Sequence, residues 1–192
     1  MKRIILAGLF FLLTNAAYGG DPFDCSYCAH RSKADPAPSV KEYKDCGTMA
    51  DGQVVISKKH LKLMAFDDYG LATIFAKGQH FYVKRNGSVL AVITFDNWAD
   101  DYSEGLVRSR VDGKITYHDR SFKQVIAPKY DWGFPFRNGV ALVCNGCKLG
   151  MPDGEGHTSV IGGVWGSIDR KGREVVPVRF TREEAEEKQA RH

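Results

Sequence analysis

The chain has 192 residues, of which 43% are hydrophobic and 26% are charged, and its formal net charge is +4. These values are typical of one globular domain and exclude a disordered or collagen-like chain. The basic residues are dispersed along the chain, so the composition also argues against a nucleic-acid partner. Twenty glycines with eleven Phe and eight Tyr favour many short strands and turns over long helices.

The first nineteen residues have the pattern of a secretory signal peptide. Lys2 and Arg3 form a basic start, an apolar run spans residues 4–13, and Ala17 and Gly19 place small residues before a cleavage site. The run is shorter than the about 20 apolar residues that a membrane span needs. We therefore expect an exported protein, periplasmic or secreted, with no membrane span in the mature chain.

A repeat of about 34 residues organises most of the remaining sequence. Gly70, Gly105 and Gly139 each precede two apolar residues and recur at intervals of 35 and 34. Trp98 and Trp132 are 34 residues apart, and each stands seven residues before a repeat glycine. Regular spacing of this kind indicates structural units that stack on one another and bury a shared core.

Within each unit the pattern predicts three short antiparallel strands. In the first unit these strands are expected at residues 71–75, 81–85 and 89–94. Glycine-containing dipeptides between β-rich runs indicate type I′ hairpin turns, which need positive φ at both central residues. These dipeptides are Lys77-Gly78, Asn86-Gly87 and Asp112-Gly113. We expect Trp98 with Tyr102, and Trp132 with Phe136, to fill the junctions between neighbouring units.

Three segments each match a part of one pattern. Val164–Gly172 has Trp-Gly, Ile-Asp and a glycine turn, Val125–Asp131 ends in Tyr-Asp, and Tyr102–Leu106 has an acidic residue before Gly-Leu. Trp165 stands at the Trp-Gly position of the first of these segments. In combination they resemble the WG-repeat (KWG) family of bacterial proteins, over about residues 55–178. The resemblance implies a scaffold of β-hairpin repeats, and it implies neither a reaction nor catalytic residues.

The predicted fold is all-β, with tandem three-stranded meanders over residues 53–180. Three complete units favour an open array, because a propeller needs at least four blades. Residues 20–52 are polar and turn-rich and contain three of the five cysteines, so we expect a separate N-terminal segment. In the tail, residues 181–192, Thr181 and Glu184 form a capping box that predicts a short helix over the open end of the array.

The five cysteines are the most distinctive chemical feature, and they are Cys25, Cys28, Cys46, Cys144 and Cys147. Disulfides are the default in an exported protein, and we expect them to tie the N-terminal segment to the insert described below. The alternative is zinc, because two CxxC pairs supply four thiolates, with His30 and His157 as further ligands. Covalent haem is disfavoured, because His30 stands one position too late for CxxCH.

The third unit carries about 16 extra residues, which we assign to an insert at about residues 145–163. Six glycines and three polar residues, Asp153, Glu155 and His157, favour a flexible surface loop with these three as binding candidates. Neither a phosphate-binding nor a calcium-binding loop has this spacing.

No GxSxG or HExxH motif occurs in the sequence, and His60, His80 and His118 are expected at the surface or in strands. We therefore expect a non-enzymatic scaffold that binds an envelope protein or a cell-wall glycan. The alternative is a metal- or thiol-responsive protein that uses the two CxxC pairs.

Overall fold

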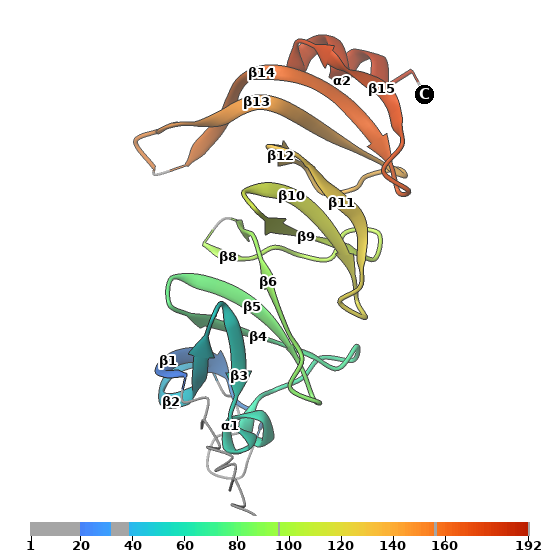
Figure 1. The fold of residues 1–192 in the computed structure, drawn as a ribbon. Helices are drawn as coiled ribbons and strands as arrows, with labels where there is room; N and C mark the ends of the chain where they lie inside the picture. The colour runs from blue at the N-terminus through green and yellow to red at the C-terminus, as the bar shows by residue number, and fades with distance from the viewer. Residues whose placement is uncertain (1–19, 32–38, 96, 156, 192) are drawn as a thin grey trace, which may run out of the picture.

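The structure is a computed structural model that describes residues 20–31, 39–95, 97–155 and 157–191. The predicted signal peptide, residues 1–19, lies outside these described residues. The described chain is mostly β with antiparallel sheets, and it ends in a short helix. The sheets follow one another in chain order from one end of the molecule to the other (Figure 1). Across the described ranges, no helix combines the length and apolar character needed to cross a membrane.

The first sheet has six strands and curls into a near-closed, barrel-like shape. In spatial order its strands are β3 (Gln53–Ile56), β2 (Val40–Ala50), β1 (Asp21–Cys28), β4 (Leu71–Ala76), β5 (Gln79–Lys84) and β6 (Val89–Val92). The short helix α1 (Lys58–Leu63) connects β3 towards β4. Apolar and more exposed residues alternate along β1: Phe23, Cys25 and Tyr27 face the core, and the residues between them do not. This alternation fixes which face of β1 packs on the core.

The N-terminal segment therefore differs from the prediction. Residues 21–28 and 40–50 form two central strands of the first sheet, and β1 pairs with both β2 and β4. The polar composition of this segment is compatible with a strand, because β2 leaves most of its residues exposed and buries only Cys46 fully. Pairing with β4, which is distant in sequence, supplies the apolar partners that the segment lacks on its own.

Two further sheets complete the molecule. The three-stranded sheet consists of β11 (Gln124–Tyr130), β10 (Lys114–Asp119) and β9 (Leu106–Val111). The four-stranded sheet consists of β12 (Trp132–Gly133), β13 (Val140–Pro152), β14 (Thr158–Asp169) and β15 (Glu174–Phe180). A two-stranded ladder of β7 (Thr94–Phe95) and β8 (Trp98–Ala99) follows β6. The predicted helix is present as α2 (Arg182–Gln189), and it lies on the last sheet (Figure 1).

The hairpin turns show two geometries. Lys77-Gly78 and Asp112-Gly113 have positive φ at both residues, as the type I′ prediction requires. At Asn86-Gly87 only Gly87 has positive φ, so the type I′ prediction is wrong there although β5 and β6 do pair. Gly87 N–H donates to the Lys84 carbonyl and Lys84 N–H donates to the Ser88 carbonyl, which makes a longer loop around a type I turn.

This longer loop recurs at the positions that the sequence repeat aligns. Asp119 N–H donates to the Lys123 carbonyl, and Asp169 N–H donates to the Arg173 carbonyl. Two repeat glycines also share a geometry, because Glu104-Gly105 and Asn138-Gly139 both have positive φ at each residue. At Gly70 only the glycine has positive φ, so the first unit enters its meander by a different turn.

Candidate functional site

The cysteines form two separate disulfides. Cys25 pairs with Cys46 between β1 and β2, and Cys144 pairs with Cys147 within β13. The predicted bridge between the N-terminal segment and the insert is therefore wrong. The β1–β2 ladder brings the Cα atoms of Cys25 and Cys46 to 5.9 Å, whereas β1 and β13 stand towards opposite ends of the stack (Figure 1).

The same placement keeps the two CxxC pairs from forming one zinc site. Cys28 lies on β1, outside both disulfides, and His30 is an exposed residue whose Nδ1 lies 2.9 Å from the Leu63 carbonyl oxygen. His157 lies between β13 and β14, and these two strands stand at the opposite end of the molecule from β1 (Figure 1). Among the described residues, no group of three or more His, Cys, Asp or Glu side chains is placed to hold a metal ion.

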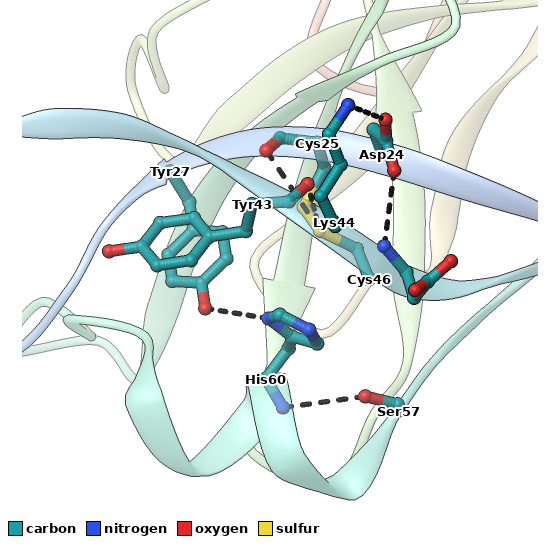
Figure 2. The surroundings of a disulfide bond; sticks show 9 residues. Asp24, Cys25, Tyr27, Tyr43, Lys44, Cys46, Ser57 and His60 are labelled. Atoms are coloured by element: carbon teal, nitrogen blue, oxygen red, sulfur yellow. Dashed lines mark hydrogen bonds and ion pairs between the residues drawn. A yellow bond between two sulfur atoms is a disulfide. The ribbon is translucent and has the colours of Figure 1, made fainter.

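A cluster of two tyrosines and a histidine packs beside the Cys25–Cys46 disulfide (Figure 2). The Tyr27 and Tyr43 rings stack with centroids 4.1 Å apart, and the Tyr27 hydroxyl shares a hydrogen bond of 2.8 Å with Nδ1 of His60. Burial raises the pKa of Tyr27 to about 12 and lowers the pKa of His60. The cluster fixes α1 against β1 and β2, so its role is structural.

The insert forms a β-ribbon where a flexible loop was predicted. We call residues 145–163 the arm: β13 and β14 continue as a two-stranded antiparallel ribbon that projects from the last sheet (Figure 1). Pairing at Cys147↔Gly162 and Leu149↔Val160 places Gly146, Gly150, Gly162 and Gly163 within the two strands. At the root, Gly146, Gly162 and Gly163 have positive φ, which bends the ribbon.

The three predicted binding residues lie at the arm's tip. Asp153 Oδ1 accepts hydrogen bonds from the backbone N–H groups of Glu155 and His157, each 2.9 Å long. His157 Nδ1 lies 3.9 Å from the Asp153 carboxylate and 3.8 Å from the Glu155 carboxylate. These contacts are local and exposed, so the three residues close the hairpin tip, and their predicted binding role stays a prediction.

The arm's exposed surface is instead apolar. Three large apolar side chains stand out from it, with exposed fractions of 53% for Leu149, 89% for Met151 and 46% for Ile161, and Val164, next to the arm's end, is 42% exposed. Leu149 and Met151 share one face of the ribbon, and Ile161, which pairs with Lys148, lies on the other face. Large apolar side chains left exposed on a projecting ribbon are a feature of interaction surfaces.

A groove of ≈ 280 Å³ lies where the arm meets the rest of the molecule. Leu149 lines it from the arm, Ala91 from β6, Arg110 from β9 and Trp132 from β12, so three sheets contribute. The Arg110 guanidinium lies over the Trp132 ring, 5.3 Å from its centroid. Burial lowers the pKa of Arg110, against the opposing effect of the nearby Asp131 carboxylate.

A buried ion pair holds the groove's walls in place. Arg108 donates through Nη2 to Oδ1 of Asp100 at 2.6 Å and through Nε to Oδ2 at 3.0 Å. Its Nη1 donates to the carbonyl oxygen of Gly133 at 3.0 Å, which joins β9 to β12. Both side chains are almost fully buried, so this pair sets the position of Trp132, next to Gly133 on β12.

The repeat aromatics divide between core and surface. Phe136 and Trp165 are buried, with exposed fractions of 1% and 2%, and Tyr102 stacks on Tyr82 with centroids 5.2 Å apart. Trp98 is 50% exposed, so its predicted role as a junction filler is wrong. Leu149 of the arm lines the same groove as Trp132, whereas Trp98, on β8, does not line that groove.

Sequence reasoning missed Arg108, Arg110 and Leu149. The two arginines stand two positions apart in a predicted strand, which places both on one face of that strand. On β13, apolar residues recur with period two at Cys147, Leu149 and Met151, a strand pattern hidden by the surrounding glycines.

The family model of the WG containing repeat matches residues 116–148. This segment is similar to a WG containing repeat. This confirms the predicted resemblance over the segment from β10 to the middle of β13, which includes Trp132 and both cysteines of the Cys144–Cys147 disulfide. Neither a curated protein nor a solved structure matches the chain.

Proposed function

We propose that the protein is an exported, non-enzymatic binding scaffold whose arm holds an extended segment of an envelope protein. The observation that supports this proposal is the arm itself, a projecting ribbon with three exposed large apolar side chains, Leu149, Met151 and Ile161. Export rests on the signal-peptide pattern of residues 1–19, and disulfides are characteristic of exported proteins.

The proposed architecture is an open array of WG-type units. Its support is the recurring turn at residues 84–88, 119–123 and 169–173, together with the order of the sheets along the molecule. Each unit packs on the next, because a lone meander leaves one apolar face uncovered. An array of this kind presents a long surface without a deep cavity, which suits a macromolecular partner.

The chemistry of the arm favours a polypeptide segment as the partner. In the part of the arm beyond residues 145 and 164, β13 and β14 pair only with each other in the described chain, so each strand has an outer edge for a third strand. An added strand is a common mode of peptide recognition. The groove beside Leu149 and Trp132 then takes an apolar side chain of the partner.

The test is capture of partners from an envelope extract by the purified protein. In a shortened variant, residues 148–161 are replaced by Asn-Gly, which joins the paired Cys147 and Gly162 through a two-residue turn. A point variant carries Leu149→Glu and Met151→Glu. The matched control is Val125→Glu, at an exposed apolar residue of β11 away from the arm.

We expect the intact protein and the Val125→Glu control to capture the same envelope protein, and both arm variants to lose it. Site-specific photocrosslinking from position 151 identifies the segment in contact. Equal recovery of every partner by all four proteins contradicts the proposed role of the arm.

A second candidate function is a thiol response at the arm. The observation that favours it is the Cys144–Cys147 disulfide at the arm's root, where Gly146 bends the ribbon. Reduction of this bond would free a bend that the disulfide now restrains. A thiol count and elemental analysis on protein purified from the periplasm distinguish disulfide-bonded, metal-bound and free cysteines. Four blocked cysteines that resist mild reductant, with no bound metal, contradict this candidate.

A further inference from the structure

A second surface feature lies away from the arm. A cleft of ≈ 430 Å³ opens between the loop after β8 and the turn that precedes β13. This volume is within the range of pockets for small molecules, about 300–1,000 Å³. The residues that matter here are Trp98, Asp101, Ser103, Pro135 and Arg137.

Trp98 forms an aromatic wall that no other side chain covers fully. Its exposed fraction is 50%, against 2% for Trp165, and Trp132 is partly buried at the equivalent position of the next unit. The Trp98 ring contacts the His80 ring, and the two centroids lie 5.7 Å apart. An exposed indole beside a cleft supplies a flat apolar surface at little conformational cost.

Two opposite charges stand near this wall. Asp101 and Arg137 both line the cleft and are exposed, and no hydrogen bond or ion pair engages either side chain within the described ranges. Asp100 also lines the cleft, but its carboxylate is fully engaged by Arg108. The cleft therefore offers one acceptor group and one donor group with a net charge near zero.

The cleft's two walls are held together by the fold. The Ser103 hydroxyl donates a hydrogen bond of 2.6 Å to the Phe136 carbonyl oxygen, which ties the loop after β8 to the turn before β13. The two backbone N–H groups that close this turn belong to Arg137 and Val140. A ligand that enters the cleft thus meets a preformed site, which reduces the entropy lost on binding.

We propose that this cleft binds a neutral saccharide built of pyranose rings. One face of a pyranose presents C–H groups that pack against an indole, and its rim presents hydroxyls that both donate and accept hydrogen bonds. Asp101 accepts from these hydroxyls and Arg137 donates to them. An anion such as phosphate is disfavoured because the Asp101 carboxylate repels it, and an apolar peptide leaves both charges without partners.

The site is independent of the proposed function, since no residue of the arm lines the cleft. The experiment is isothermal titration of the purified protein with two probes, the β-1,4-linked tetramers of N-acetylglucosamine and of glucose. Inorganic phosphate is the third titrant. The variants are Trp98→Ala, Arg137→Gln and Phe75→Ala, the last of which removes a 40% exposed ring that does not line the cleft.

We expect saturable binding of at least one tetramer and none of phosphate. Trp98→Ala weakens this binding by about tenfold or more, a loss of about 1.4 kcal/mol or more, Arg137→Gln weakens it by a smaller factor, and Phe75→Ala leaves it unchanged. The arm-shortened variant binds the tetramer as the intact protein does. The proposal is overturned if neither tetramer binds, if phosphate binds instead, or if Phe75→Ala and Trp98→Ala have equal effects.

Discussion

At the scale of single residues, the Arg108–Asp100 pair has the largest structural consequence. Asp100 is 2% exposed, and its carboxylate accepts from the Arg108 side chain and from the Arg108 backbone N–H. We expect Arg108→Met to lower the free energy of unfolding by about 3–5 kcal/mol, because a buried carboxylate is left without its partner. Chemical denaturation followed by tryptophan fluorescence measures the change.

The control for this prediction is an exposed pair. Lys44 and Asp24 form an ion pair on the surface of the first sheet, where solvent screens the attraction. Lys44→Met is expected to leave the denaturation midpoint almost unchanged. A variant with both Arg108→Met and Asp100→Asn should recover part of the loss. If Arg108→Met and Lys44→Met have the same small effect, the buried Arg108–Asp100 pair does not stabilise the fold.

Three buried histidines predict how stability depends on pH. His80 and His118 lie in strands, as predicted, whereas His60 lies in α1. All three are buried, with exposed fractions of 2% for His60, 4% for His80 and 8% for His118. Burial lowers the pKa of each below its ordinary value of 6.5. The unfolded chain therefore takes up these protons more readily than the folded chain does. Stability is fully present above about pH 6.5 and decreases as the pH falls through that value.

The measurement is the midpoint of urea unfolding between pH 8 and pH 5. Replacing His60 with Gln removes one of the three protonation sites, so the midpoint of the variant should change less over this interval. The lowered pKa values of Asp119, Asp131, Asp169 and Glu174 act in a more acidic range and do not interfere. Parallel pH profiles for the variant and the original protein would show that His60 titrates freely in the fold.

At the scale of elements, local sequence patterns were sufficient to predict the turns and helix caps that neighbouring residues form. The capping box is present: Thr181 Oγ1 accepts from Glu184 N–H at 3.2 Å, and the Glu184 carboxylate accepts from Thr181 N–H at 3.0 Å. Lys77-Gly78 likewise has the backbone that its residue types demand. These structures depend on backbone preferences that a four-residue window already contains.

Elements that depend on distant partners could not be predicted in the same way. β1 owes its place to pairing with β4, about 50 residues away, and sequence composition carries no record of that pairing. The arm was misread because six glycines outweighed the alternation of Cys147, Leu149 and Met151. The exposure of Trp98 was likewise hidden, since it depends on which neighbouring segment covers the ring and not on the repeat spacing.

The two disulfides also differ at this scale. Cys25–Cys46 joins residues 21 positions apart, and the chain-entropy model assigns such a bridge about 3 kcal/mol of stabilisation. Cys144–Cys147 joins residues three positions apart, for which the same model gives about 2 kcal/mol. The first therefore contributes more to the stability of the N-terminal sheet, whereas the second restrains the local bend at the arm's root.

At the scale of the whole molecule, the stack of sheets needs an end. α2 provides it: Ala185 is fully buried against the last sheet, and the Arg182 guanidinium lies 5.4 Å from the Trp165 ring centroid and 5.1 Å from that of Phe134. Four of the helix's eight residues are acidic and its outer face is exposed. The helix thus covers an apolar face of the last sheet and presents a charged surface to solvent, as terminal caps of repeat arrays do.

Removing residues 181–192 should therefore expose Trp165 and Phe180 on a sheet face that resembles the junction between units. We expect the truncated chain to associate with itself, because the uncovered apolar face can pack against the same face of a second copy. Size-exclusion chromatography with light scattering, over a range of concentrations, measures the mass relative to that of the full chain. Removing only residues 190–192, beyond the end of α2, is the matched control and should leave the mass per chain unchanged. A truncated chain that elutes as the full chain does at every concentration, with its Trp165 emission unshifted, would show that the last sheet is complete without its helix.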